Sequence, residues 1–261
     1  MKNNSIKKQL TRFAPLLSVL FWLLLWFLLA LLFDQPLLLP TPMAVLKKMG
    51  ELFVTGSFWL TVALSLSRVF TGILAALLLG TVLAFLTVRF SLLHHLFSPL
   101  LSLLKTTPVV SVIFLLLLFI GRSTVPLVIA FAMAMPIVWS NVREGLLATD
   151  RRLLEMASSF RVPRGRMIKS ILLPSVVPYF LAACRAGVGI AFKAGIAAEV
   201  LAVPERSIGR AIYESKLYLL TDELFAYTLT VVVISAVIEY AVLSLLPQRG
   251  TQKGEKDIWS N

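Results

Sequence analysis

Residues 13–33 read FAPLLSVLFWLLLWFLLALLF, a run without a single charged side chain. A helix needs about 20 apolar residues to cross the hydrocarbon core of a bilayer, so this run is long enough to span it. The strands of an outer-membrane barrel would instead alternate in polarity over about 10 residues, and residues 16–33 show no such alternation. The run therefore predicts an all-helical (all-α) integral membrane protein, because helices are the remaining structure that satisfies the backbone in lipid.

The same run could be mistaken for a secretory signal peptide, because Lys2, Lys7, Lys8 and Arg12 precede it. Its apolar length exceeds the ~7–15 residues of a signal core, and the residues that follow, 34–36, offer no small-residue cleavage site. We therefore expect a first helix that is retained.

The composition of the whole chain agrees with a membrane protein. Of its 261 residues, 58% are hydrophobic and 15% are charged, and the mean hydropathy is +0.89, whereas soluble domains are about 45–50% apolar. A net charge of +12 could indicate nucleic-acid binding. The basic residues lie mostly in short segments between apolar runs, however, where they orient a chain in the bilayer.

Five further apolar runs predict a total of about six transmembrane helices. They cover residues 66–88, 96–120, 124–142, 177–201 and 225–246. Lys and Arg residues concentrate in the N-terminal tail (1–13), the loop 143–174 and the C-terminal tail (247–261). The positive-inside rule therefore predicts that both tails are cytoplasmic, on either side of a transmembrane domain over residues 14–246. The polar C-terminal tail is expected to be disordered.

The loop 143–174 carries seven basic residues and an amphipathic pattern. Leu153, Ala157 and Phe160 follow the spacing i, i+4, i+7, which places them on one face of a short helix. Such a helix could simply rest at the lipid headgroups, with its arginines paired to phosphates.

The ends of this short helix are also marked in the sequence. Thr149 or Asp150 is a suitable N-cap, and Pro163 with Gly165 is expected to end the helix.

Around this helix the loop reads Glu155-Met-Ala-Ser-Ser-Phe-Arg161 and then Ile171-Leu-Leu-Pro174. This order resembles the cytoplasmic EAA…G…I-x-L-P loop of binding-protein-dependent ABC transporter permeases. Weaker matches follow in the family's order over roughly residues 36–246, including Ser65-Leu-Ser-Arg68, Ala198-Glu199 and Ser207-Ile-Gly209. The chain looks most like the branch that imports sulfonates, taurine, nitrate and thiamine precursors.

The resemblance implies the architecture of a type I ABC importer permease in the inner (cytoplasmic) membrane. It implies as partners two copies of a cytoplasmic ATPase, an external substrate-binding protein and a second permease copy. The sequence contains no G-x-x-x-x-G-K-[ST], so ATP is expected on the partner ATPase. We expect no cofactor, no metal and no catalytic residues on this chain.

In such permeases the loop helix docks into a groove of the ATPase and couples the two subunits. By this resemblance, the coupling residues are Arg151, Arg152, Leu154, Glu155, Met156, Ala157, Phe160 and Arg161. The family usually has glycine at the position of Arg161, where a positive φ follows the helix. We expect Arg161 to adopt another turn, or the helix to run on to Val162.

Charged residues inside a membrane span are costly, about 2.5–3.5 kcal/mol each at the centre, and therefore indicate function. The predicted pathway residues are Ser111, Asn141, Arg185, Lys193 and Glu199. Arg185 and Glu199 are about 21 Å apart along the helix axis, too far to pair. Two basic groups in one helix suit the passage of an anion, but they could instead pair with Glu239 or with backbone carbonyls. For Ser111 and Asn141, helix capping and anchoring at the membrane interface are nearly as good an explanation as a place on the pathway.

Two further features predict structure rather than chemistry. Ala183, Gly187, Ala191 and Gly195 recur every four residues, which favours close packing against a neighbouring helix or a second copy. The pair His94-His95 has no acidic residue or cysteine nearby and is interpreted as a solvated turn, not a metal site.

Two other classes of membrane protein remain as alternatives. A proton-coupled carrier would show a relay of buried carboxylates, and a membrane enzyme would need a catalytic cluster, whereas the spans offer isolated Glu199 and Glu239. We therefore interpret the chain as the permease subunit of an ATP-driven importer. Its expected solute is a small anion such as a sulfonate, taurine or nitrate, with a thiamine precursor as the alternative.

Overall fold

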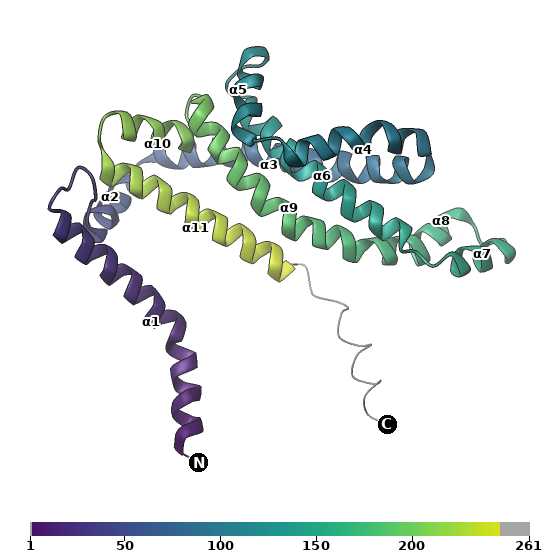
Figure 1. The fold of residues 1–261 in the computed structure, drawn as a ribbon, viewed down its shortest axis with the longest axis horizontal. Coiled ribbons are helices and arrows are strands. Elements are labelled where there is room, and N and C mark those ends of the chain that lie inside the picture. The colour runs from purple at the N-terminus through teal and green to yellow at the C-terminus, as the bar shows by residue number, and fades with distance from the viewer. Residues whose placement is uncertain (1, 246–261) are drawn as a thin grey trace. The chain divides into compact units, whose positions relative to one another are not determined.

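The computed structural model describes residues 2–245, with the side chains of residues 17–244, and every regular element in this part of the chain is helical (Figure 1). The elements are α1 (Lys2–Phe33), α2 (Pro42–Val54), α3 (Gly56–Arg89), α4 (Ser91–Thr106), α5 (Val109–Phe119), α6 (Val125–Leu147), α7 (Arg151–Ser159), α8 (Arg164–Met167), the π-helical turn η1 (Ile168–Leu172), α9 (Leu173–Ala202), α10 (Ile208–Leu217) and α11 (Thr221–Leu245). The described residues form two compact units, 2–60 with 211–231 and 61–210 with 232–245.

In the part of the chain that the structure describes, four helices are long and apolar enough to cross a membrane, which confirms the predicted class. They are Gly56–Arg89, Val125–Leu147, Arg164–Ala202 and Thr221–Ser244. The described part of α1 adds a shorter apolar helix, Leu17–Phe33. The count of six spans and the orientation stay predictions. The predicted N-terminal tail is helical from Lys2 onward, and the predicted C-terminal tail, 247–261, lies outside the described residues.

The predicted span over residues 96–120 is wrong as a single helix. The structure divides it into α4 and α5, which are bent by 111° relative to each other, so that α5 projects away from α4 (Figure 1). Pro108 explains the break, because a proline disfavours the helical conformation in the residue before it. Accordingly Thr107 is extended, with φ −73° and ψ 133°.

A second proline shapes the start of α9. The ring of Pro174 would clash with the carbonyl of Ser170 in a regular α-helix. The chain avoids this clash in η1, where the N–H of Leu173 donates to the carbonyl of Ile168, five residues earlier. As a result α8, η1 and α9 form one helical stretch from Arg164 to Ala202.

In the second unit, α6 packs along α9 through the predicted ridge of small residues. A Cβ on Gly187 would lie 3.7 Å from Ile137, and one on Gly195 would press on Val69 of α3. The ridge therefore packs against neighbouring helices of the same chain, which was one of the two predicted alternatives. A core that includes Val138, Trp139 and Val142 of α6 lies around this contact.

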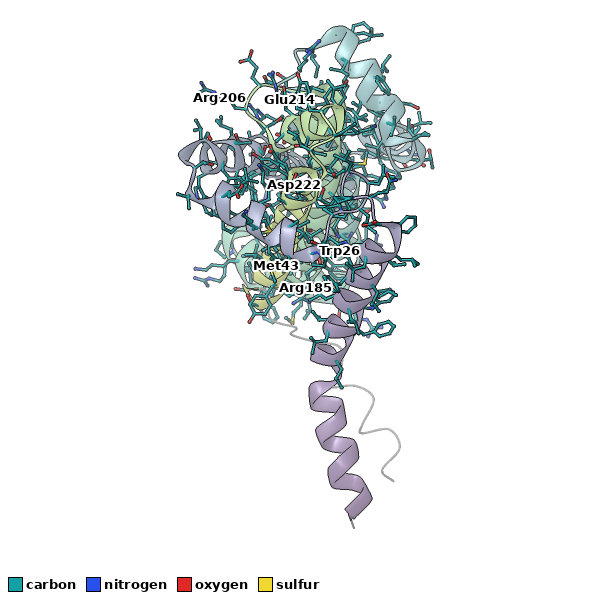
Figure 2. The ribbon with its side chains drawn as sticks, turned by 90° about the vertical axis from the view of Figure 1, so that its left-hand side faces the viewer. Trp26, Met43, Arg185, Arg206, Glu214 and Asp222 are labelled. Carbon is teal, nitrogen blue, oxygen red and sulfur yellow. The ribbon has the colours of Figure 1, made fainter. Side chains whose placement is uncertain are left out.

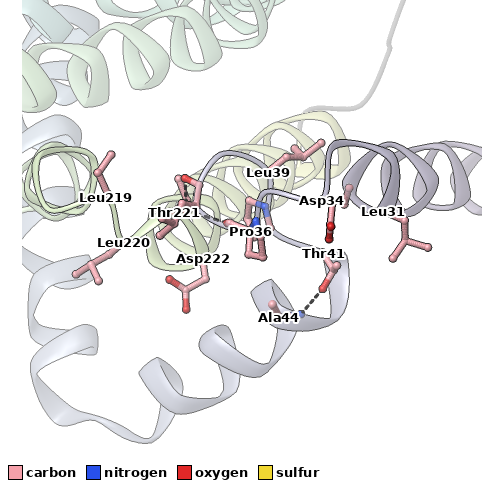
Figure 3. Close-up of a pocket in the computed structure, with 13 residues that line it drawn as sticks. Leu31, Asp34, Pro36, Leu39, Thr41, Ala44, Leu219, Leu220, Thr221 and Asp222 are labelled. Atoms are coloured by element: carbon pink, nitrogen blue, oxygen red, sulfur yellow. Dashed lines mark hydrogen bonds between the residues drawn. The ribbon is translucent and has the colours of Figure 1, made fainter.

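Aromatic side chains hold the first unit together. Trp26 of α1 stacks on Phe225 with ring centroids 5.6 Å apart, and its indole N–H donates to the carbonyl of Pro40 at 3.1 Å. Phe58 is buried and contacts Tyr227 at 5.7 Å. Figure 3 shows a pocket of this unit, with a volume of about 500 Å³ and with Asp34 and Asp222 in its lining.

Candidate functional site

The short helix α7 forms because its first turn is capped. The carboxylate of Asp150 accepts a hydrogen bond from the N–H of Arg152 at 2.8 Å, which satisfies one of the free donors at the helix start. The N-cap is therefore Asp150; the hydroxyl of Thr149 donates to the carbonyl of Gly145 instead. The prediction that Pro163 and Gly165 end the helix is wrong, because α7 ends at Ser159 and Pro163 precedes α8.

The apolar side chains of α7 differ in how far they are exposed. Ala157 is buried, and Leu154 is half-buried. Leu153, Met156 and Phe160 are exposed, Phe160 to 78%. Their spacing i, i+3, i+7 places them on one face. Ala157, which was predicted to share a face with Leu153 and Phe160, differs from them in being buried. We call Leu153, Met156 and Phe160 the apolar face of α7.

The charged coupling candidates Arg151, Arg152 and Glu155 are also exposed. Arg152 lies four residues before Met156 and therefore beside the apolar face. The helix thus presents an exposed apolar face next to charged side chains.

Arg161 adopts the left-handed conformation itself, with φ 51°. Its N–H donates to the carbonyl of Ser158 at 3.0 Å, and the N–H of Val162 donates to that of Ala157 at 2.9 Å. This pair of bonds is the Schellman motif that commonly ends a helix. Both predicted alternatives for Arg161 are therefore wrong: the turn keeps the geometry that suits glycine, with arginine in it.

We expect Arg161→Gly to stabilise the protein by about 0.5–1 kcal/mol. A non-glycine residue pays roughly 1–2 kcal/mol for the left-handed conformation, and the greater freedom of glycine in the unfolded chain takes back about 0.5–1 kcal/mol. Thermal unfolding of the purified protein would measure the gain, and Arg161→Ala, which keeps the strain, should melt like the wild type. A lower melting temperature for Arg161→Gly would show that the arginine side chain itself stabilises the turn.

Glu199, near the end of α9, is 0% exposed and fully bonded. Its Oε2 accepts from the hydroxyl of Ser65 at 2.7 Å and from the N–H of Gly209 at 3.3 Å, and its Oε1 lies 3.4 Å from Nη1 of Arg68. The Ser65 hydroxyl in turn accepts from the N–H of Ile208 at 2.9 Å. Glu199 is thus held in a buried network of Ser65, Arg68 and Gly209, and its predicted place on the pathway stays a prediction.

The same network holds a strained loop between α9 and α10. Val203 has φ 50°, a conformation that β-branched residues rarely adopt. Arg68 secures the loop by donating to the carbonyls of Glu205 at 2.9 Å and Arg206 at 3.3 Å, while the Arg206 side chain points outward (Figure 2). A Cβ on Gly209 would overlap the backbone of Glu199, so glycine is required for this close approach.

Lys193 pairs with Glu239 of α11. Its Nζ lies 2.9 Å from Oε1 of Glu239. The side chains are 64% and 47% exposed, so the pair lies on the surface of the chain within its membrane-spanning helices. The predicted alternative of a partner at Glu239 is confirmed for Lys193.

A model of the family of binding-protein-dependent transport system inner membrane components matches residues 72–247. The chain belongs to this family. It is therefore an inner-membrane permease, a non-catalytic transport subunit of an ABC system. The match begins in α3 just after Ser65 and Arg68 and includes α7, α9 and α11. Membership in the family implies an ATPase and a binding protein as partners.

Several named transport permeases are similar to most of this chain. The taurine transport system permease protein of Escherichia coli (strain K12) is 25% identical over 92% of this chain and 89% of its own. The putative aliphatic sulfonates transport permease protein of Bacillus subtilis (strain 168) is 28% identical over 72% of this chain and 68% of its own length. The formylaminopyrimidine transport permease protein of Halalkalibacterium halodurans is 24% identical over 77% of this chain and 80% of its own length.

The other predicted pathway residues of the permease do not gather into one cluster. Arg185 is half-buried, and its Nε is buried without a hydrogen-bond partner among the described residues. The amide of Asn141 donates to the carbonyl of Ile137 at 2.8 Å, which is a local bond within α6. Ser111 is exposed in α5. Of these three residues, Arg185 is thus the one with a buried polar atom that has no partner among the described residues.

Sequence reasoning did not assign a role to Ser65, Arg68 or Gly209 of the permease. All three belong to motifs of the resemblance, so the signal was present, but nothing local showed that they meet at Glu199. His94 also differs from expectation: its ring stacks on Trp139 at 6.0 Å, so it is half-buried and not in a solvated turn.

Proposed function

We propose that this permease carries a small anion, such as a sulfonate, taurine or nitrate, delivered by an external binding protein. Two similar permeases are named for taurine and aliphatic sulfonates. The observation that carries the proposal is the charge of α9, where Arg185 and Lys193 place two cations in a membrane-spanning helix. A residue of this kind marks a solute pathway more often than it serves packing.

The proposed assembly contains two copies of the permease and two ATPase subunits, which bind the ATP. Each permease would have six spans with both ends in the cytoplasm, as the distribution of Lys and Arg predicts. No cofactor is needed on the permease itself.

The proposed coupling element is α7. A short capped helix with an exposed apolar face can follow the rigid-body motion of a partner domain. Only the turn over residues 160–163 separates α7 from the helical stretch Arg164–Ala202. Closure of the ATPases would therefore move α7 and, through this stretch, the part of α9 that carries Arg185 and Lys193.

A thiamine precursor is the second candidate solute. The formylaminopyrimidine permease is nearly as similar to this chain as the taurine permease, at 24% against 25% identity. Competition between unlabelled solutes and labelled taurine in an uptake assay distinguishes the two classes.

The proposal is tested by Glu155→Arg in α7. We expect the wild type, purified in mild detergent from its native membrane, to retain a stoichiometric ATPase. We also expect cells that contain the wild type to take up labelled taurine. Glu155→Arg should lose both, because it reverses the charge on the coupling helix. Glu51→Arg is the matched control: it makes the same change of charge on an exposed residue of α2 and should lose neither.

The outcomes test the coupling role of α7 and the anionic nature of the solute separately. A wild-type preparation without an ATPase would contradict the coupling role of α7. Retained ATPase with no uptake of taurine, sulfonates or nitrate would contradict the anionic solute and leave the thiamine precursor.

A further inference from the structure

One face of α9 carries a row of three residues spaced four apart: Arg185, Gly189 and Lys193. Residues at i, i+4 and i+8 lie one above the other on a helix, about 6 Å apart along the axis. Glu239 of α11 packs on this row, with its Oε1 2.9 Å from Nζ of Lys193. The row and Glu239 together have a formal charge of +1.

The glycine in the middle of the row makes room for the carboxylate. A Cβ on Gly189 would lie 3.0 Å from Oε1 of Glu239 and 3.6 Å from its carboxyl carbon. The carboxylate of Glu239 therefore occupies the space over Gly189, with Lys193 one turn away on one side and Arg185 one turn away on the other. Among the described residues, the buried Nε of Arg185 has no hydrogen-bond partner.

Lys193 and Glu239 are charged residues on a mixed surface. The exposed residues on the same side of α9 are Ala182, Ala186, Ile190 and Ala197. Large apolar side chains such as Ile190 are exposed there, as Leu74 and Leu78 are on α3. It is therefore the charged pair itself that indicates contact with water. A charged pair that is about half exposed would be costly in hydrocarbon, and charges in spans almost always face a water-filled cavity or the bundle interior.

We propose that Arg185, Lys193 and Glu239 form a water-facing anion-exchange site. When no solute is bound, the Glu239 carboxylate forms an ion pair with the ammonium group of Lys193. The anionic group of the solute takes the place of this carboxylate on Lys193, and Arg185 supplies the second positive charge. A sulfonate suits this exchange, since it is an oxyanion that accepts hydrogen bonds from an ammonium group as a carboxylate does. The inference deepens the proposed function and rests on its anionic solute.

The internal carboxylate gives the site a physical advantage. An unpaired cation in a membrane span is costly, and Glu239 lowers that cost for Lys193 between transport cycles. Because the solute must compete with Glu239, it is held weakly enough to leave. In this site Lys193 is the group that binds either the Glu239 carboxylate or the solute anion. Arg185 gives the site the net positive charge that attracts an anion.

The first test uses cysteine accessibility, which depends on no identified solute. Cys184 is the chain's one cysteine, so Cys184→Ala gives a cysteine-free permease in its full complex. In this background we expect Lys193→Cys to react with water-soluble methanethiosulfonates, because thiols ionise only in contact with water. Leu78→Cys on α3 is the matched control and should not react.

The effect of the Arg185 charge is then measured by comparing the reaction rates of an anionic and a cationic methanethiosulfonate. With Lys193→Cys and Glu239→Gln combined, the anionic sulfonatoethyl reagent should react faster than the cationic trimethylammonioethyl reagent. Adding Arg185→Gln should lower this preference about tenfold, since one free charge at close range is removed. No reaction at position 193, or a preference that Arg185→Gln leaves unchanged, would overturn the proposal.

The second test measures the exchange with all three charged groups of the site available. Ala186→Cys lies on the same surface and keeps Arg185, Lys193 and Glu239. We expect ethanesulfonate to slow its labelling, and Glu239→Gln to lower the ethanesulfonate concentration for half-protection at least tenfold. A carboxylate with a purely structural role would leave that concentration unchanged, which would overturn the exchange.

These outcomes are distinguishable from failure of the proposed function. Accessibility, the charge preference and protection by ethanesulfonate are read without any transport. If they hold while cells take up neither taurine nor nitrate, the anion-exchange site stands and the identity of the solute is wrong.

Discussion

Arg68→Met is expected to destabilise the permease by about 3–5 kcal/mol, the usual cost of leaving a buried charge without its partner. Glu199 is 0% exposed, and the guanidinium of Arg68 is its counter-charge. The substitution also removes the hydrogen bonds to the carbonyls of Glu205 and Arg206, which hold the loop around Val203 in its strained conformation. Thermal unfolding in detergent, with the yield of monodisperse protein, would measure the loss.

Two further variants show whether the charge causes the effect. Arg68→Met combined with Glu199→Gln should recover a large part of the stability, because no uncompensated charge is then buried. Arg89→Met, at the exposed end of the same helix, should change the stability by no more than about 0.5 kcal/mol. A double variant as unstable as Arg68→Met alone would show that the ion pair is not what holds the network together.

The second large effect is expected at the apolar face of α7. Phe160→Ala together with Met156→Ala should weaken the association with the ATPase at least ~30-fold, because a buried aromatic anchor is typically worth about 2 kcal/mol or more at an interface. Both side chains are exposed in the permease, so its own melting temperature should change little. The fraction of ATPase that remains bound through a dilution series measures the loss.

Leu92→Ala is the control for this face, since it removes an equally exposed apolar side chain from the start of α4. It should leave the ATPase bound. An undiminished yield of ATPase from the Phe160→Ala, Met156→Ala variant would show that α7 does not dock through this face. The alternative of a helix resting at the lipid headgroups would then account for its apolar side chains.

Much of the fold follows from features that act over a few residues. Apolar length predicts the helices that became α3, α6, α9 and α11, because a bilayer imposes the same requirement wherever a helix crosses it. The order of residues in the loop 143–174 was enough to identify the family, and Asp150 caps α7 as its position predicts. The break at Pro108 was also encoded locally, but the high hydropathy on both sides of it concealed the change of direction.

The candidate site depended on contacts that no local pattern contains. Glu199 meets Ser65, 134 positions earlier in the sequence, and Lys193 meets Glu239, 46 positions later. Charges in a span could be identified from the sequence, but their partners depend on how each helix is rotated about its axis. That rotation is fixed by packing at glycines such as Gly187 and Gly195, where neighbouring helices approach most closely.

The sequence by itself therefore determined that this protein is a helical membrane permease with a coupling loop, because hydropathy and capping are properties of neighbouring residues. The tertiary structure alone decided that Glu199 is locked into a buried network and that Glu239 lies on Lys193. It also decided that Leu153, Met156 and Phe160 face outward. Each of these depends on which helices pack together, and the energies of such contacts are set by residues far apart in the chain.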